Sequence, residues 1–324
     1  DDWDERSDRL KSGQTEIAYT IAILPISETP MKLRRLYHLV TKRSRAVAFL
    51  PALVSGCSPL GLLDAVVPDG DYQRQAGIVY GDLPRQKLDV YRPNFPAEDA
   101  PVIVFFYGGS WKSGERGKYR FVADALTQRG YTVIIPDYRL YPQARFPAFM
   151  NDAARAVRWT AENIRLPDGR KPSLFLAGHS AGAHIAALLS ADRQYLRDAG
   201  VPAGTICGVI GLAGPYAFDP LRYRSTRAVF ADLKTTDPAR PVKQVAKGQP
   251  PYLLLHGAGD TTVRPSNTVE FANALKASGN SVDTVILPDI GHYRIILAVA
   301  RPFDDIAPVN DRIAAFIDGH RDCR

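Results

Sequence analysis

A serine lies between two glycines in the run GHSAG at residues 178–182, where a short apolar stretch meets a helical pattern. This G-x-S-x-G spacing puts the serine on a sharp strand-to-helix turn, with a strained backbone and an exposed hydroxyl. The glycines are required because a side chain at either position would collide with the neighbouring strand or helix. The turn therefore predicts a nucleophile at Ser180. A glycine-containing turn of no chemical consequence is the alternative interpretation.

A serine hydroxyl is a weak nucleophile and needs a histidine to accept its proton. The chain has six histidines. His292, in the run LPDIGHY, directly follows the last expected strand, where a loop could bring its imidazole onto Ser180. The others fit less well: His38 in a basic leader, His179 inside the turn, His184 on the following helix, His256 ahead of every plausible acid, and His320 near the end.

A carboxylate must hold that histidine in the correct tautomer, and after this kind of turn the chain order is serine, acid, histidine. Asp260, in the run LLLHGAGDTTV, follows an apolar strand through a glycine-rich loop and fits this order. Its alternative role is an Asx turn or helix cap. Asp289 and Asp283 are rival acids, although such positions more often hold turn or strand-end residues. We favour Asp260, with Ser180 and His292, as the catalytic set.

Attack on a carbonyl builds negative charge on its oxygen, and each backbone N–H aimed at that oxygen is worth about 3 kcal/mol. The amide of Ala181, next to the serine, is one expected donor. The run YGGSW at 107–111 follows the apolar stretch VIVFF, and we assign its Gly109 and Ser110 amides as the others. Three aromatic residues are expected to line the substrate pocket, although aromatics there are as often core: Trp111, Tyr216 and Phe218.

The elements that must position these groups begin near residue 73, where short β-branched runs alternate with longer helical patterns. This rhythm is typical of one α/β domain with a mainly parallel sheet. Residues 77–91 are expected to form an opening antiparallel pair. Further strands are expected at 102–106, 131–136, 173–177, 206–212, 252–255 and 282–287, and helices at 116–130, 149–164, 183–199 and 308–319. The polar residues 218–248 form a short insertion after the sixth strand.

The net charge of +7 is concentrated in one segment. Residues 31–45 hold six Lys and Arg and no acid, so the rest of the chain carries only 7 − 6 = +1. A domain in which positive and negative charges are so nearly equal lacks the excess positive charge that is typical of a nucleic-acid-binding protein. Three widely spaced cysteines, Cys57, Cys207 and Cys323, indicate neither a disulfide framework nor a zinc site, and no metal or cofactor is expected.

The first seventy residues are interpreted as a targeting region rather than as part of the folded domain. The apolar residues 46–54 follow the basic segment and lead to Ser55-Gly56-Cys57, the order of a secretory signal. The closing VSGC resembles the lipobox of bacterial lipoproteins, in which the cysteine receives lipid. Residues 31–56 are then a lipoprotein-type signal segment, and residues 57–72 a tether that leads to a catalytic domain over 73–324. Residues 1–30 are an upstream extension that is not native.

This interpretation places the protein in a bacterial cell envelope, lipid-anchored through Cys57 or periplasmic, and otherwise in the cytoplasm. A buried or transmembrane helix is the alternative for residues 46–63, which carry no charge. Two prolines and two glycines in and just after the apolar run argue against a continuous helix.

Five motifs in this order resemble the esterase and lipase branch of α/β hydrolases, and within it the group with an H-G-G-x-W loop. They are YGGSW at 107–111, DYRLYPQARFPA at 137–148, GHSAG at 178–182, HGAGDTTV at 256–263 and GHY at 291–293. That group includes kynurenine formamidase-like, isoprenylcysteine methylesterase-like and bacterial feruloyl-esterase-like enzymes. The resemblance covers residues 77–320 and implies the α/β-hydrolase fold, with a mostly parallel eight-stranded sheet flanked by helices.

The resemblance also implies that Tyr138, Arg139 and Asp152 brace the oxyanion loop. The chain departs from the group at Tyr107, where the group usually has histidine, and this change bears on loop rigidity or substrate preference. The expected function is a serine carboxylesterase that hydrolyses a small or medium ester through an acyl-enzyme. Two alternatives remain: an arylformamidase or amide hydrolase with the same triad, and a catalytically silent, anchored binding protein on a hydrolase scaffold.

Overall fold

The computed structural model describes residues 70–323, which contain one eight-stranded sheet in the order β1-β2-β4-β3-β5-β6-β7-β8. The strands are β1 (Tyr72–Val79), β2 (Lys87–Pro93), β3 (Val102–Phe106), β4 (Thr132–Pro136), β5 (Leu174–His179), β6 (Ile206–Leu212), β7 (Tyr252–Gly257) and β8 (Val282–Leu287). Only β2 runs antiparallel to its neighbours, β1 and β4, and every other pair is parallel. The predicted α/β-hydrolase architecture is confirmed.

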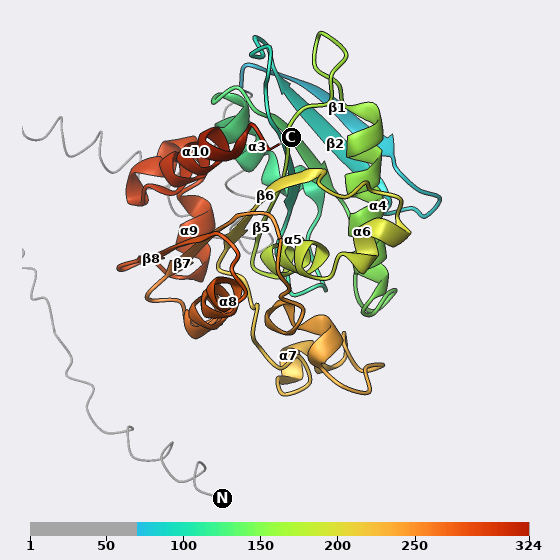
Figure 1. Cartoon of the computed structure of the whole chain (residues 1–324), viewed down its shortest axis with the longest axis vertical. Helices are drawn as coiled ribbons and strands as arrows, with labels where there is room; N and C mark the ends of the chain where they lie inside the picture. The colour runs from blue at the N-terminus through green and yellow to red at the C-terminus, as the bar shows by residue number, and fades with distance from the viewer. Residues whose placement is uncertain (1–69, 324) are drawn as a thin grey trace, which may run out of the picture. The chain divides into compact units, whose positions relative to one another are not determined.

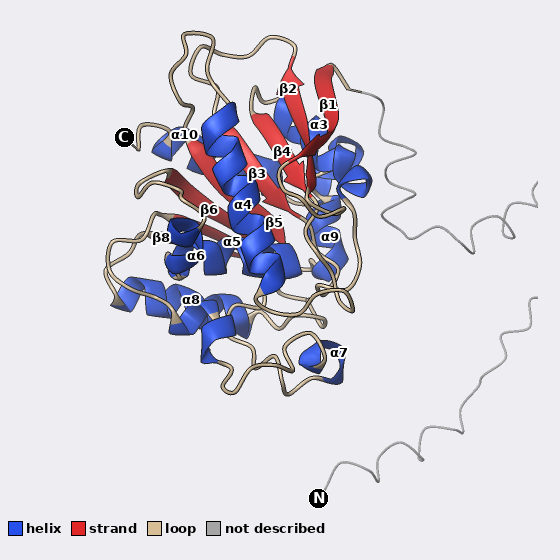
Figure 2. Cartoon of the chain, turned by 90° about the vertical axis from the view of Figure 1, so that its right-hand side faces the viewer, coloured by secondary structure: helices blue, strands red, loops and turns tan. Residues whose placement is uncertain are grey.

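Helices cover both faces of this sheet. They are α3 (Arg120–Thr127), α4 (Ala148–Asn163), α5 (Ala181–Ala191), α6 (Gln194–Asp198), α7 (Arg224–Arg227), α8 (Ser266–Ala277), α9 (His292–Leu297) and α10 (Val309–His320). Short 3-10 turns are η2 (Arg116–Tyr119), η3 (Asp237–Ala239), η4 (Pro241–Lys243) and η5 (Arg301–Ile306). Helices α3 and α10 lie on one face, and α4, α5 and α8 on the other (Figures 1 and 2).

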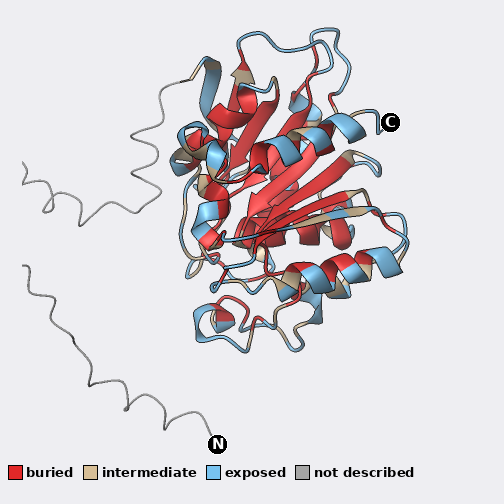
Figure 3. Cartoon of the chain, turned by 90° about the vertical axis from the view of Figure 1, so that its left-hand side faces the viewer, coloured by how far each residue is buried: buried red, intermediate tan, exposed pale blue. Residues whose placement is uncertain are grey.

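The central strands are buried along their whole length because helices shield both faces. All residues of β3, β5 and β7 are buried, and Figure 3 shows this buried layer between helices whose outer faces are exposed. Such strands read as continuous apolar runs rather than alternating ones. Since β3, β5, β6, β7 and β8 are parallel, the loops after them meet at one edge of the sheet, where ligands bind in open α/β sheets.

The helix expected at 183–199 is divided in two. Helix α5 ends at Ala191, and the backbone of Asp192 is extended, with φ −96° and ψ 91°. The Asp192 carboxylate then accepts a hydrogen bond of 3.0 Å from the Gln194 amide, at the start of α6. A short aspartate side chain that bonds the backbone in this way competes with a continuous helix.

Cys207 and Cys323 form a disulfide, a pair that the spacing of the cysteines did not indicate. Their Cα atoms are 5.3 Å apart across a sequence separation of 116 residues. Cys207 lies in β6 and Cys323 follows α10, which contacts that strand, so packing brings the two together. Spacing alone does not reveal such a pair. A disulfide typically stabilises a domain by about 2–4 kcal/mol.

The upstream extension, the signal segment, Cys57 and most of the tether lie before residue 70 and so outside the described residues. Within residues 70–323, no helix is both long enough and apolar enough to cross a membrane.

Candidate active site

Strand β5 ends one residue before Ser180, and α5 begins one residue after it. Ser180 has φ 55° and ψ −122°, a conformation that a residue with a side chain adopts only where its surroundings enforce it. A Cβ on Gly178 would overlap the backbone of Gly182, and one on Gly182 would overlap the Phe106 carbonyl group in β3. The two glycines therefore let strand, turn and helix pack closely and hold the serine in its strained position.

The three predicted catalytic side chains come together at the carboxyl edge of the sheet. The His292 Nε2 atom is 2.9 Å from the Ser180 Oγ, and its Nδ1 is 2.7 Å from an Asp260 Oδ2. Asp260 lies in the loop after β7, and His292 is the first residue of α9, after β8. The rival acids Asp283 and Asp289 are both exposed. This arrangement can draw a proton from the serine hydroxyl and stabilise the resulting imidazolium.

The Asp260 carboxylate is held by the backbone as well as by histidine. Its Oδ1 accepts hydrogen bonds from the amides of Thr262, at 2.9 Å, and Val263, at 2.8 Å. Burial alone would raise the pKa of Asp260, but hydrogen bonds from His256, His292 and the Val263 amide outweigh it and hold that pKa well below its ordinary value. The carboxylate therefore stays ionised at neutral pH and accepts the Nδ1 proton of His292.

His256 is a part of this site that the sequence interpretation missed. Its Nε2 lies 3.2 Å from the Asp260 Oδ2 and 2.8 Å from the Val263 carbonyl oxygen, so that nitrogen carries a proton. The Thr268 hydroxyl lies 2.6 Å from the Nδ1. Chain order disfavours His256 as the base because it precedes the acid, yet its fully buried side chain is a second partner of that acid. The sequence feature that could have indicated this contact is the spacing of four residues between His256 and Asp260, across one short loop.

Two further histidines near the nucleophile are buried and neutral. The His179 Nε2 donates to the His292 carbonyl oxygen at 2.9 Å, and burial, with a smaller contribution from His292, lowers the pKa of His179 to about 3. The His184 Nε2 donates to the Ala239 carbonyl oxygen at 2.7 Å, and burial lowers its pKa to about 4. Neither competes with His292 for the serine proton, and His179 helps to fix the backbone of His292.

The loop at residues 107–111, which follows β3 and is the predicted oxyanion loop, has an unusual backbone. Gly109, Ser110 and Trp111 have successive positive φ values of 123°, 53° and 57°. The Gly109 carbonyl accepts hydrogen bonds from Lys112 and Ser113, at 2.9 and 3.1 Å, which close the loop into a tight turn. Backbone strain of this kind persists only where the surrounding structure imposes it, and it is found most often at functional sites. Gly109 and Ser110 line the same cavity as Ser180, and Ala181 lines a second one.

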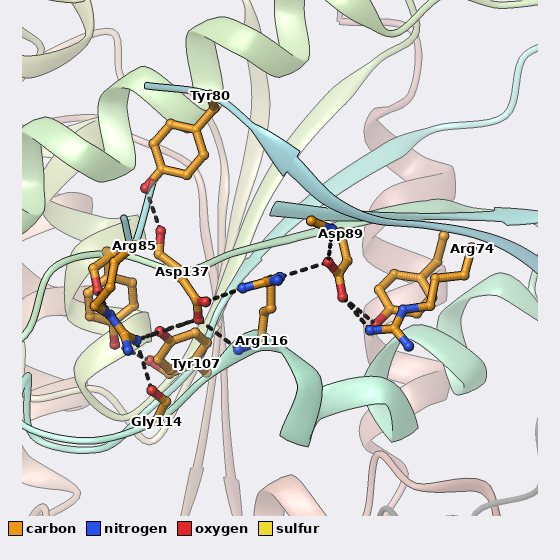
Figure 4. Close-up of polar contacts among 11 residues, drawn as sticks. Arg74, Tyr80, Arg85, Asp89, Tyr107, Gly114, Arg116 and Asp137 are labelled. Carbon is orange, nitrogen blue, oxygen red and sulfur yellow. Dashed lines mark hydrogen bonds and ion pairs between the residues drawn. The ribbon is translucent and has the colours of Figure 1, made fainter. Parts of the chain in front are cut away.

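Tyr107 anchors this loop in the place of the usual histidine. Its hydroxyl donates to the Asp137 carboxylate at 2.8 Å and accepts from the Arg85 guanidinium at 2.7 Å (Figure 4). Its ring stacks between those of Tyr138 and Tyr119, with centroids 4.7 and 5.4 Å apart. Tyr138 also donates to the Tyr107 carbonyl oxygen at 2.7 Å. Burial raises the pKa of Tyr107 well above its ordinary value, so the hydroxyl stays protonated and can donate.

The anchor continues into a chain of ion pairs that crosses to the opening strands (Figure 4). Arg116 pairs with Asp137 and, at 2.7 Å, with Asp89, which pairs in turn with Arg74 at 2.7 Å. Arg85 donates to the Gly114 carbonyl oxygen at 2.9 Å and so holds the far end of the loop. The loop is therefore held at both ends by charged side chains, in which the carboxylates are buried and the guanidinium groups are partly exposed.

The family resemblance also implies a bracing role for Arg139 and Asp152. The two side chains form a bidentate pair with two contacts of 2.8 Å, and the Gln86 amide joins it at 2.7 Å. This pair fixes the segment after β4. Tyr138, by contrast, touches the oxyanion loop directly through Tyr107.

Replacing Tyr107 with phenylalanine tests the anchor. The ring stack is kept, but Asp137 and Arg85 each lose a buried partner, so the free energy of unfolding should fall by about 1–2 kcal/mol. Looser oxyanion amides should also lower kcat about threefold to tenfold with little change in KM. The control is Tyr252→Phe, which removes a buried hydroxyl from β7 at 2.9 Å from Ser190 and should affect stability alone. Unchanged kcat in Tyr107→Phe would contradict the bracing role.

Two cavities adjoin Ser180. The first, about 470 Å³, is lined by residues that include Gly108, Tyr119, His179, His292 and Tyr293. The second, about 320 Å³, is lined by residues that include Trp111, Ala181, Phe218, Tyr223 and Arg264. Hereafter these are the histidine cavity and the arginine cavity. Both reach Ser110, Ser180 and Thr262, so the nucleophile lies between them.

Two of the three aromatic residues expected to line the substrate pocket line a cavity beside Ser180. Trp111 and Phe218 border the arginine cavity, with ring centroids 5.8 Å apart and planes 9° from parallel. Tyr216 corrects the expectation, because its fully buried ring packs on Phe271 at 5.0 Å and lines neither cavity. The lack of side chains at Gly211 and Gly214 makes room for that ring in the core.

The strained serine turn, the Ser-His-Asp contacts and the sheet topology define the class as an α/β-hydrolase fold with a serine-hydrolase type of site. The chain belongs to the BD-FAE family, whose model matches residues 88–275.

Curated relatives include several esterases. Esterase LipC of Mycobacterium tuberculosis is 32% identical over 270 residues, which cover 76% of this chain and 65% of that protein. Isoprenylcysteine alpha-carbonyl methylesterase ICME of Arabidopsis thaliana is 29% identical, with 73% and 62% covered. Kynurenine formamidase of Danio rerio is 27% identical, with 68% and 74% covered. The chain thus spans just under two thirds of the length of the two esterases.

Solved structures agree on the fold. Inhibited esterase B of Lactobacillus rhamnosis superposes with a TM-score of 0.67 at 20% identity, over 87% of this chain and 96% of that one. A truncated carbohydrate esterase from gut microbiota gives a TM-score of 0.66 at 18% identity, over 79% and 99%.

Proposed function

We propose that this protein is a serine carboxylesterase that hydrolyses a small or medium carboxylic ester through an acyl-enzyme. The observation that carries the proposal is the unbroken hydrogen-bonded series from Ser180 through His292 to Asp260, with spacings of 2.9 and 2.7 Å, beside the strained oxyanion loop. The family membership and the esterases among its relatives support the same reaction class.

In the first half of the reaction, the Ser180 Oγ attacks the ester carbonyl carbon while the His292 Nε2 takes its proton. The negative charge that develops on the carbonyl oxygen is stabilised by the amides of Gly109, Ser110 and Ala181. His292 then passes the proton to the departing alkoxide oxygen, the C–O bond breaks, and the acyl group remains on the serine.

In the second half, His292 accepts a proton from water, which attacks the acyl carbon. Collapse of the second tetrahedral intermediate returns the proton to the Ser180 Oγ and releases the carboxylic acid. Asp260 remains ionised throughout and stabilises the imidazolium form of His292.

The size of the site supports a small or medium substrate. The two cavities hold about 470 and 320 Å³, within the range of small-molecule sites. Each could take the group on one side of the ester bond, because Ser180 lies between them.

A fluorophosphonate probe tests the proposal, because it reacts only with an activated serine. We expect it to label the protein at Ser180 and to block hydrolysis of 4-nitrophenyl esters graded by chain length. A protein that is neither labelled nor active would be a silent binding scaffold, and the proposal would fail.

The relationship to kynurenine formamidase favours amide hydrolysis as a second candidate with the same residues. Rates on an aryl ester, N-formylkynurenine and a peptide anilide would separate the two, since a formamidase should prefer the formamide.

We further propose that the protein is exported to a bacterial cell envelope, with lipid attached at Cys57. The Cys207–Cys323 disulfide supports an oxidising compartment, where such bonds persist. Cys57→Ala should abolish palmitate labelling and move the esterase from the membrane to the soluble fraction, or block its processing. Cys323→Ala, the control, should keep the label. Palmitate incorporation that survives Cys57→Ala would contradict the anchor.

A further inference from the structure

The two cavities beside Ser180 differ in their relation to His292. His292 and the adjacent Tyr293 line the histidine cavity, and neither lines the arginine cavity. The alkoxide that leaves during ester cleavage must receive its proton from the His292 Nε2, so the alcohol part has to lie within reach of that atom. The histidine cavity thus suits the alcohol, and the arginine cavity is left for the acyl group.

The arginine cavity contains one cation and no acid in its wall. Arg264, at the end of the loop that carries Asp260, is exposed, and its guanidinium contacts no carboxylate among the described residues. The histidine cavity differs, because the ammonium group of its Lys118 is 3.0 Å from the Glu115 carboxylate. Among the residues that line the two cavities, the cation without a carboxylate partner is therefore the one in the arginine cavity.

The rest of the arginine cavity combines apolar rings with hydroxyl groups. The half-buried ring of Phe218 forms part of one side and stacks on the buried ring of Trp111. Thr261, Thr262 and Ser225 contribute short polar side chains. The exposed part of the Phe218 ring can contact the carbon chain of an acyl group, and the Arg264 guanidinium offers paired donors that match a carboxylate. Esters of monocarboxylic acids would leave that guanidinium unused.

We propose that the arginine cavity binds an acyl group that ends in a carboxylate, so that the preferred substrates are half-esters of dicarboxylic acids, with Arg264 as the residue that determines this specificity. The proposal rests on the esterase function above and adds a substrate class to it. Arg264 acts on binding, and the reacting atoms remain with the triad and the loop amides.

The test compares two esters of equal chain length, mono-4-nitrophenyl glutarate and 4-nitrophenyl pentanoate. In Arg264→Gln, we expect KM for the glutarate half-ester to rise about tenfold, with kcat little changed. Kinetics on the pentanoate ester should stay within about twofold. Arg264→Lys should recover part of the loss, and 0.5 M salt should weaken the preference of the unaltered protein but not that of Arg264→Gln.

The control for net charge is Arg312→Gln. Arg312 is exposed on α10 and lines neither cavity, so its loss should leave both KM values unchanged. A second pair of esters, 4-acetoxybenzoate and phenyl acetate, puts the carboxylate on the alcohol side, where Arg264→Gln should have no effect.

Three outcomes of these measurements would contradict different parts of the proposal. If Arg264→Gln leaves the glutarate half-ester unaffected, the anion subsite is wrong even though the esterase stands. If it impairs 4-acetoxybenzoate instead, the assignment of acyl and alcohol cavities is overturned. If the unaltered protein hydrolyses none of these esters and no fluorophosphonate label reaches Ser180, the esterase proposal itself fails.

Discussion

Replacing Ser180 with alanine is expected to lower kcat/KM for 4-nitrophenyl butyrate on the order of 10⁴-fold or more, while the protein remains folded. The acyl-enzyme cannot form without the Oγ, and His292 loses the hydroxyl that lies 2.9 Å from its Nε2. The oxyanion amides remain, which would account for any residual rate. Stopped-flow release of nitrophenol, with a urea unfolding curve for stability, measures both quantities.

The matched control is Ser281→Ala, which removes an exposed serine hydroxyl just before β8. It should change neither kcat nor KM. Hydrolysis by Ser180→Ala within tenfold of the unaltered protein would reject the nucleophile and the acyl-enzyme mechanism with it.

Replacing Asp260 with asparagine should produce the second largest loss, about 10³- to 10⁴-fold in kcat. The asparagine amide can present an N–H toward the His292 Nδ1 and so favour the wrong tautomer. The ionised carboxylate that now accepts hydrogen bonds from His292, His256 and two backbone amides would also be gone. Steady-state kinetics should show most of the loss in kcat.

Asp289→Asn provides the control for this prediction, because Asp289 is the exposed rival acid three residues before His292. It should keep nearly full activity. Equal losses in the two variants, or a larger one in Asp289→Asn, would show that the acid was assigned to the wrong loop.

The sequence alone was enough to predict the fold class and the three side chains that the structure brings together. The signals were local: a glycine-flanked serine between a strand and a helix, a glycine-rich loop before Asp260, and a histidine directly after the last strand. Because parallel strands end at the same edge of a sheet, residues that follow different strands must meet there. Both Asp260 and Asp289 fit the chain order, and the place of Asp260 in a glycine-rich loop after a strand favoured it over Asp289.

Only the tertiary structure decided the features that depend on distant segments. The disulfide joins cysteines 116 residues apart, and Tyr107 is held by Arg85 and Asp137 from other parts of the chain. The Tyr216 ring packs in the core against Phe271. The contact of His256 with Asp260 depends on the path of the loop that joins them. The spacing of apolar and turn residues along the sequence determines which helices and strands form and where they end. The partners of a side chain are determined by packing between elements that are distant in sequence, and no local pattern contains that information.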